Sequence, residues 1–184
     1  MTKPTKLILL SQVAFLVLVG ICVAILPHFL FAGNEGGMSN YGVHTTTVAF
    51  YTLAFVLSAA LLLCAARELP ATKDYRPIKT IFAVTACSLL LVLVTTYPYQ
   101  HNNTFGNIHT AANILTFCFE MLAGGWIALV FHRSLASILL LLLQLAAFVL
   151  LILTFIGTIH LLFVAQILTL VAFGLLLVIG TTTT

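Results

Sequence analysis

Residues 135–156 read LASILLLLLQLAAFVLLILTFI, an apolar run that contains no charged side chain. A helix rises 1.5 Å per residue, so about 20 residues cross the ~30 Å hydrocarbon core of a bilayer. Strands of a membrane barrel alternate apolar and polar residues, and this run does not alternate. The run therefore predicts a transmembrane helix.

Five further apolar runs of similar length occur in the 184-residue chain, of which 62% is hydrophobic. Charged residues make up 6% of the chain, whereas a soluble domain carries about 25%. We therefore expect an all-α, polytopic integral membrane protein, with one membrane domain over 1–184 folded as a bundle of six transmembrane helices. The predicted spans are 7–32, 46–66, 78–97, 108–131, 135–156 and 161–180.

The last two spans are joined by a few residues around Gly157, which predicts a tight helical hairpin. Apart from Gln144 and Gln166 they consist almost entirely of large apolar residues. We therefore expect both helices to lie at the periphery, against lipid.

The basic residues predict the orientation of the chain. They precede the first span or lie in and next to the loops after the second and fourth spans: Lys3, Lys6, Arg67, Lys73, Arg76, Lys79 and Arg133. The loops on the other side contain none. Because cytoplasmic loops are enriched in Lys and Arg, both termini are expected in the cytoplasm. The net charge is +3, and the basic residues behind it serve to orient the chain in the membrane. The charge therefore does not predict a nucleic-acid partner.

Histidines gather on the opposite, outer side of the predicted topology. Only His132 is cytoplasmic, and the others are His28, His44, His101, His109 and His160. Imidazole serves as a base, a metal ligand or a pH sensor, so the distribution indicates an outward-facing polar pocket. Interfacial histidines that bond to headgroups and loop carbonyls would give the same pattern.

A divalent metal is a further alternative for these histidines. Its candidate ligands are His28, His44, His101 and His109. They lack the spacing of a helical metal motif, and Glu35 is the only acidic residue on that side.

The outer loops also contain a glycosylation sequon at Asn102, which is used only in a eukaryotic secretory pathway.

The fourth span carries polar residues in steps of four, three and four: His109, Asn113, Thr116 and Glu120. This spacing places them on one face of a helix, and polar groups facing lipid are costly, so the stripe is predicted to face the bundle interior. Glu120 would lie near the bilayer midplane, either neutral or tightly partnered. Its expected hydrogen-bond partners at that depth are Ser58, Ser88 and Gln144.

Three short motifs belong together: Ser39-Asn40-Tyr41-Gly42, Tyr97-Pro98, and Gly106-Asn107-Ile108-His109 followed by Ala112. In this order they resemble the DRAM/FRAG/Sfk superfamily of six-helix membrane proteins and its prokaryotic relatives. The resemblance implies cytoplasmic termini and a lipid-related or regulatory role, since eukaryotic members are linked to GPI-anchor remodelling, lipid asymmetry and autophagy. The residues of this chain that match the family are Ser39, Gly42 and His109. Asn40 replaces an acidic residue common in the family, which weakens any transfer of acid-dependent chemistry.

Four functions remain open from the sequence. The first is binding of a lipid headgroup or small polar ligand in the outer pocket, by His109, Asn113, Thr116, Glu120, His44, His101 and Ser39. The others are an intramembrane lipid hydrolase or transferase with or without a metal, a transporter that cycles a proton on Glu120, and a structural or regulatory subunit. The expected partners are membrane lipids, a second copy of the chain or another membrane protein. The sequence contains no hydrolase, P-loop or dinucleotide-binding motif. Whether the chain is an enzyme is therefore left open at this point.

Overall fold

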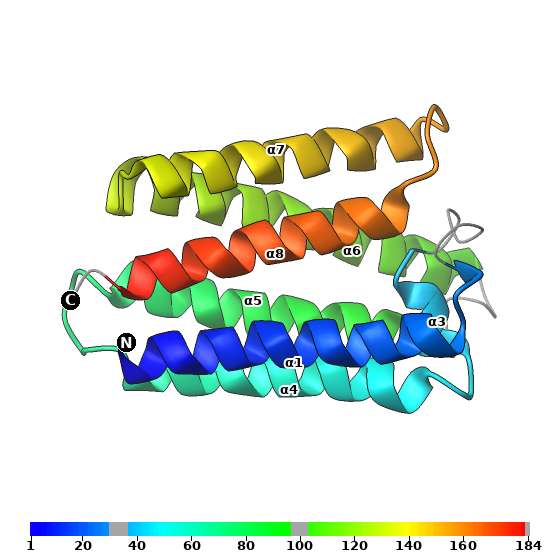
Figure 1. Ribbon diagram of the computed structural model, residues 1–184, viewed down its shortest axis with the longest axis horizontal. Coiled ribbons are helices and arrows are strands. Elements are labelled where there is room, and N and C mark those ends of the chain that lie inside the picture. The colour runs from blue at the N-terminus through cyan, green and yellow to red at the C-terminus, as the bar shows by residue number, and fades with distance from the viewer. Residues whose placement is uncertain (30–36, 97–102, 183–184) are drawn as a thin grey trace.

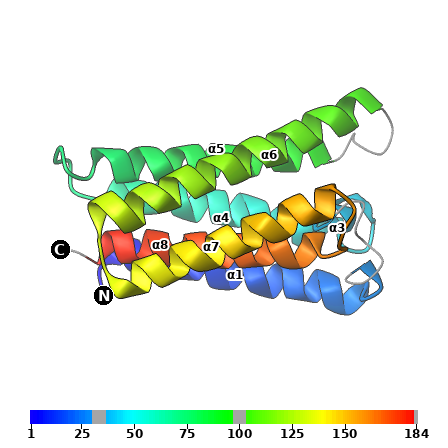
Figure 2. The ribbon, with the colours of Figure 1, turned by 90° about the horizontal axis from the view of Figure 1, so that it is seen from above.

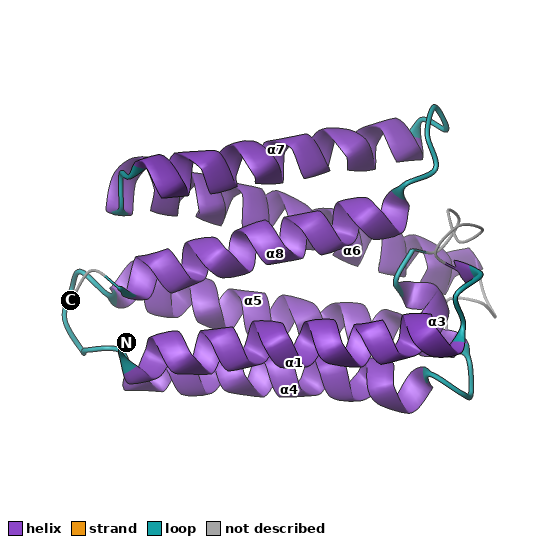
Figure 3. Ribbon diagram, in the orientation of Figure 1, coloured by secondary structure: helices purple, strands orange, loops and turns teal. Residues whose placement is uncertain are grey.

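The computed structural model describes residues 1–29, 37–96 and 103–182, without the side chains of Asn103 and Phe105. All regular structure in these ranges is helical (Figures 1 and 3). Six helices are long and apolar enough to cross a membrane, which confirms the predicted six-helix bundle. The elements are α1 (Lys3–Ile25), α3 (Ser39–Val43), α4 (Val48–Glu68), α5 (Arg76–Thr96), α6 (Asn103–Trp126), η1 (Ile127–Phe131), α7 (Leu135–Phe155) and α8 (Leu162–Thr181).

The helix boundaries follow from the local sequence. α1 ends at Ile25, well before the predicted end at residue 32, because Leu26 precedes Pro27 and leaves the helical conformation. α6 begins five positions before the predicted residue 108 and continues into the π-helix η1. α7 starts with a capping box formed by Ser134 and Ser137.

The helices α1, α4, α5, α6 and α8 pack against one another around a common interior. α1 lies along α4, and Phe15 meets Phe55 edge to face at 5.2 Å between ring centres. α7 lies at the edge of the bundle, against α8 and the α6–η1 helix (Figures 1 and 2). The predicted α7–α8 hairpin is present, and its turn contains Gly157 at φ 80°, a conformation that favours glycine.

The two helices of this hairpin differ in burial, which corrects the expectation that both are peripheral. In its most apolar window α7 has 17% of its residues buried, whereas α8 has 50%, the same share as α5. α8 can enter the bundle because small residues on its buried face let neighbours approach closely. At Gly174, for example, a Cβ atom would collide with the side chain of Gln12 on α1.

Both chain ends lie at the same end of the bundle (Figure 1). There the Nζ atom of Lys3 lies 2.7 Å from the Oε1 atom of Glu68, the last residue of α4. The short helix α3 lies at the opposite end (Figure 1). The bundle therefore has one end that contains the termini and another that contains the α3 segment.

Candidate functional site

Three cavities follow one another through the interior of the bundle. The histidine cavity, of about 180 Å³, is lined by Ser39, Gly106, His109, Thr110, Asn113, Phe117, Leu151, Phe155, Leu162 and Gln166. The connecting cavity, of about 40 Å³, shares Asn113, Phe117 and Gln166 with it. The glutamate cavity, of about 20 Å³, shares Leu89, Glu120 and Leu170 with the connecting cavity. Polar side chains thus line an interior that reaches from the α3 end toward the middle of the bundle.

The α3 segment contributes Ser39 to the polar lining of the histidine cavity. The backbone N–H of Met38 donates to Oε1 of Gln166 on α8 at 2.8 Å, which ties the start of this segment to the bundle. Gly37 has φ 52°, and a Cβ atom there would collide with the same glutamine side chain. The turn at Gly37 therefore places Ser39, the first residue of α3, over the cavity.

His109 on α6 is held by partners from three elements. Its Nε2 atom lies 2.7 Å from Oγ of Ser39 and 3.0 Å from Nδ2 of Asn113. Its Nδ1 atom lies 3.0 Å from Oγ1 of Thr95 at the end of α5. The ring is 6% exposed and Ser39 is 3% exposed, so the network lies out of bulk solvent.

These contacts determine the tautomer of His109. Oγ1 of Thr95 lies 2.9 Å from the carbonyl oxygen of Leu91 and 3.0 Å from that of Val92, so its hydroxyl hydrogen is directed to the backbone. Thr95 must then accept a hydrogen bond from Nδ1–H of His109. The lone pair of Nε2 is left to accept from the hydroxyl of Ser39 or the amide of Asn113. A serine hydroxyl facing an unprotonated imidazole nitrogen is the arrangement in which histidine can act as a base.

Asn113 completes the polar lining. Its Nδ2 atom donates to the backbone oxygen of His109 at 2.9 Å, which assigns the amide nitrogen to this position because an oxygen there would face another oxygen. The same nitrogen lies 3.0 Å from Nε2 of His109, which makes Asn113 and Ser39 alternative donors to that atom. The apolar part of the cavity lining consists of Phe117, Leu151, Phe155 and Leu162. No residue in the described lining carries a formal charge when His109 is neutral.

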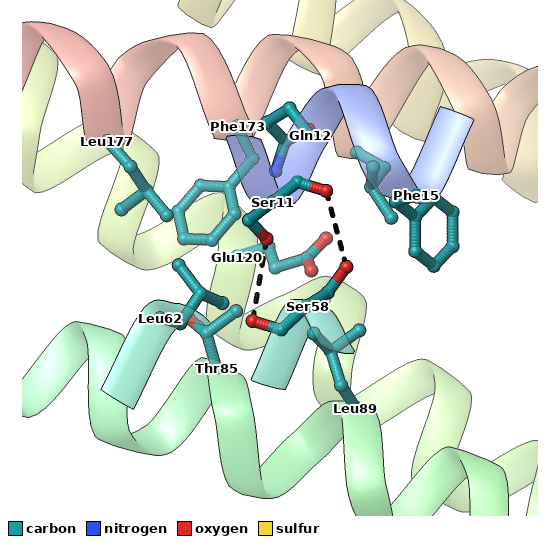
Figure 4. A pocket seen from close by; sticks show the side chains of 11 residues that line it. Ser11, Gln12, Phe15, Ser58, Leu62, Thr85, Leu89, Glu120, Phe173 and Leu177 are labelled. Atoms are coloured by element: carbon teal, nitrogen blue, oxygen red, sulfur yellow. Dashed lines mark hydrogen bonds between the residues drawn. The ribbon is translucent and has the colours of Figure 1, made fainter. Parts of the chain in front are cut away.

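The glutamate cavity differs from the histidine cavity in the hydrogen bonding of its ionisable side chain. Glu120 is 4% exposed, and no hydrogen bond or ion pair of its carboxyl group occurs within the described ranges. Polar side chains from α1, α4 and α5 also line this cavity, namely Ser11, Gln12, Ser58 and Thr85 (Figure 4). Ser11 and Ser58 each place Oγ 3.4 Å from the other's carbonyl oxygen and join α1 to α4.

The predicted polar stripe faces the interior cavities. His109 and Asn113 line the histidine cavity, Thr116 lines the connecting cavity, and Glu120 lines the connecting and glutamate cavities. Of the expected partners of Glu120, Ser58 lines the same cavity. Gln144 lies against Gly124 instead, and Ser88 is half-buried and lines none of the three cavities.

The predicted histidine cluster is not present among the described residues. His28 and His44 are exposed, and their rings lie 4.2 and 4.7 Å from the Phe29 ring between ring centres. Neither histidine lines the histidine cavity. His160 is also exposed. An exposed imidazole can be solvated where it stands, so nothing forces these side chains toward His109. His101, Glu35 and the sequon at Asn102 lie outside the described residues.

The donor set around His109 does not fit a zinc or copper site. Its neighbours are hydroxyl and amide groups, and within the described ranges no three His, Cys, Asp or Glu residues lie together in a way that could hold a metal ion. Zinc sites in proteins are built from imidazole, thiolate and carboxylate ligands. The metal alternative therefore gains no support from the described part of the chain.

Several residues of the two sites could not be assigned from the sequence. Thr95, Ser11, Gln12 and Thr85 are visible there only as polar residues within apolar runs, which does not reveal the face on which they lie. Gln166 interrupts the last span in the same way.

Comparison of the chain with family models, with curated proteins and with solved structures finds no match in any of the three.

Proposed function

We propose that this protein binds the polar part of a membrane lipid, or a small polar molecule of similar chemistry, in the histidine cavity. The observation that supports this proposal is that polar and apolar side chains line the same cavity. Ser39, His109, Asn113 and Gln166 line it together with Phe117, Leu151, Phe155 and Leu162. A lipid also combines polar and apolar parts, with hydroxyl and ester groups next to acyl chains, and ligand sites commonly combine an apolar lining with a few placed polar groups.

The charge of the cavity narrows the chemistry of the ligand. Its described lining contains hydroxyl, amide and imidazole groups but no Lys or Arg. A phosphate group buried there would lack a countercharge, and an unpaired buried charge is costly. Ester carbonyls and hydroxyl groups need only hydrogen bonds, and whichever of Ser39 and Asn113 does not donate to Nε2 of His109 can donate one to the ligand. We therefore assign the cavity to the ester or hydroxyl region of a lipid rather than to its phosphate.

The orientation of the bundle is part of the proposal. Both termini lie at one end, where Lys3 also pairs with Glu68. The positive-inside rule places this basic end in the cytoplasm. The histidine cavity, at the α3 end, would then open toward the outer leaflet.

The ligand is tested by identifying lipid that co-purifies with the full-length protein in mild detergent. Asn113→Leu removes the amide donor and should lower the bound lipid measured by native mass spectrometry. Asn107→Leu is the matched control, because it makes the same change on an exposed position of α6. Equal lipid occupancy in the two variants would contradict binding in the histidine cavity.

A second candidate function is acyl transfer, favoured by the 2.7 Å contact between Ser39 and His109. In this reaction Oγ of Ser39 forms a bond to an ester carbonyl carbon and its proton moves to Nε2 of His109. The bond to the leaving alcohol then breaks, and that alcohol takes the proton from His109. Water or a second alcohol releases the acyl group from Ser39 by the same steps.

A fluorophosphonate probe separates this reaction from binding alone. The wild-type protein should be labelled at Ser39, and His109→Gln should lose the label because Gln provides no base. Ser134→Ala is a control at a serine of the other end of the bundle. Lipid binding without labelling of Ser39 would reject acyl transfer and leave the binding proposal intact.

A further inference from the structure

Glu120 poses a problem of charge balance in the centre of the bundle. It lies in the membrane-spanning helix α6 and is 96% buried, since its exposed fraction is 4%. Lys and Arg residues do not occur in the described lining of the connecting and glutamate cavities. An ionised carboxylate without a positive partner is strongly disfavoured in such surroundings. Glu120 therefore needs either a bound proton or a cation that is not part of the chain.

The glutamate cavity presents oxygen atoms to such a cation. The hydroxyl hydrogen of Thr85 is donated to the carbonyl oxygen of Ile81 at 2.8 Å, which leaves the oxygen lone pairs free to accept. Ser11 and Ser58 also direct their hydroxyl hydrogens at backbone carbonyls. Figure 4 shows the Glu120 carboxyl group beside the Ser11–Ser58 pair. Three hydroxyl oxygens and one carboxyl group from four helices thus line one small space.

Gln12 adds a further polar group to this set. Its side chain lines the cavity, and its buried Oε1 atom has no hydrogen-bond partner within the described ranges. A turn of the amide about its terminal bond exchanges the oxygen and nitrogen and would bring the oxygen to the cavity. A cation bound there would satisfy an oxygen atom that is now orphaned.

The size of the cavity and its single acidic group indicate a small cation with one positive charge. A space of about 20 Å³ holds one water-sized particle. Carboxylate and hydroxyl oxygens suit hard cations. One carboxylate balances one positive charge, whereas Mg²⁺ or Ca²⁺ would leave a net charge in the interior.

The neighbouring cavities share lining residues with this one. Glu120 lines both the glutamate and the connecting cavity, and Asn113 lines both the connecting and the histidine cavity. We assign to these polar residues of α6 the route of a cation from the α3 end. We propose that the glutamate cavity is a binding site for a single Na⁺ ion, held by Glu120 with oxygens of Ser11, Ser58, Thr85 and Gln12, and reached through the histidine cavity.

The test uses dicyclohexylcarbodiimide, which modifies protonated carboxyl groups in apolar surroundings. The purified full-length protein is incubated with it in choline chloride or in sodium chloride, and the label is located by mass spectrometry. Glu120 should be labelled in choline and protected by Na⁺, because the bound ion displaces the reactive proton. Absence of label in choline would overturn access to the site. Equal labelling in both salts would overturn Na⁺ binding and leave a site for protons alone.

Serine variants test the ligand set without removing Glu120. Ser58→Ala should keep the label in choline and should raise the Na⁺ concentration for half protection about tenfold, as loss of one supporting group at a metal site does. Ser88→Ala makes the same change at a half-buried serine that lines none of the three cavities, and should match the wild type. Identical protection curves for the two variants would overturn the assignment of Ser58 as a ligand.

Discussion

His109 and Glu120 lie on the same helix, about 16 Å apart along its axis, and their surroundings differ in kind. His109 has hydrogen-bond partners on α3, α5 and α6. Glu120 has none within the described ranges, although hydroxyl groups line its cavity. A fully bonded ring has one orientation and one tautomer, as a binding or catalytic group requires. An unpartnered carboxyl group is suited instead to exchange a proton or an ion.

The largest expected effect is loss of the histidine network. His109→Ala removes one hydrogen bond from each of Ser39, Thr95 and Asn113. Hydrogen bonds between membrane helices contribute about 0.6 kcal/mol on average, so three losses with the cavity created predict about 2 kcal/mol less stability toward unfolding. Thermal or denaturant unfolding in detergent measures this change. If His109→Ala unfolded like the wild type, the network would not contribute to the stability of the fold.

Gly37→Ala tests whether the α3 segment positions this network. The substitution places a Cβ atom at φ 52°, where the left-handed backbone costs about 1–2 kcal/mol, and against Gln166. Stability should fall by about 1.5 kcal/mol, and lipid occupancy of the histidine cavity should fall with it. Gly20→Ala on α1, where nothing lies within 4 Å of the added atom, is the control. Unchanged occupancy would mean that Ser39 is not needed over the cavity.

Glu120→Leu should have the opposite sign to His109→Ala. Replacing a buried ionisable group by an apolar residue is often neutral or stabilising, and a gain of about 1 kcal/mol is expected in sodium-free buffer. The same unfolding assay measures it, with Glu68→Leu as an exposed control. Destabilisation would reveal a bonding partner of Glu120 and remove the contrast with His109.

The smallest effect is expected at the end that contains the termini. Lys3 and Glu68 form a 2.7 Å ion pair with side chains 69% and 38% exposed. Exposed pairs contribute little, so Glu68→Gln should change stability by less than about 0.5 kcal/mol. A larger loss in the unfolding assay would show that this end, and not only the histidine network, carries polar stabilisation.

Much of the fold could be predicted from the sequence because the bilayer imposes a length and a polarity on each span. The number of helices, their type and most of their boundaries follow from apolar runs of fixed length. The end of α1 at Ile25 required attention to Leu26 and Pro27, since hydropathy alone does not register a backbone break. The polar stripe of α6 could be predicted because helical periodicity relates residues of the same helix.

The sequence by itself determined which segments are apolar helices and which polar residues share the inward face of α6. Only the tertiary structure decided that α8 belongs to the interior, that Ser39 and Thr95 hold His109, and that His28 and His44 lie elsewhere. The physical reason is that hydropathy describes the exchange of each residue with lipid. Which helices touch, and which side chains meet, depends on close packing between segments far apart in the chain, such as Ser39 and His109, 70 positions apart.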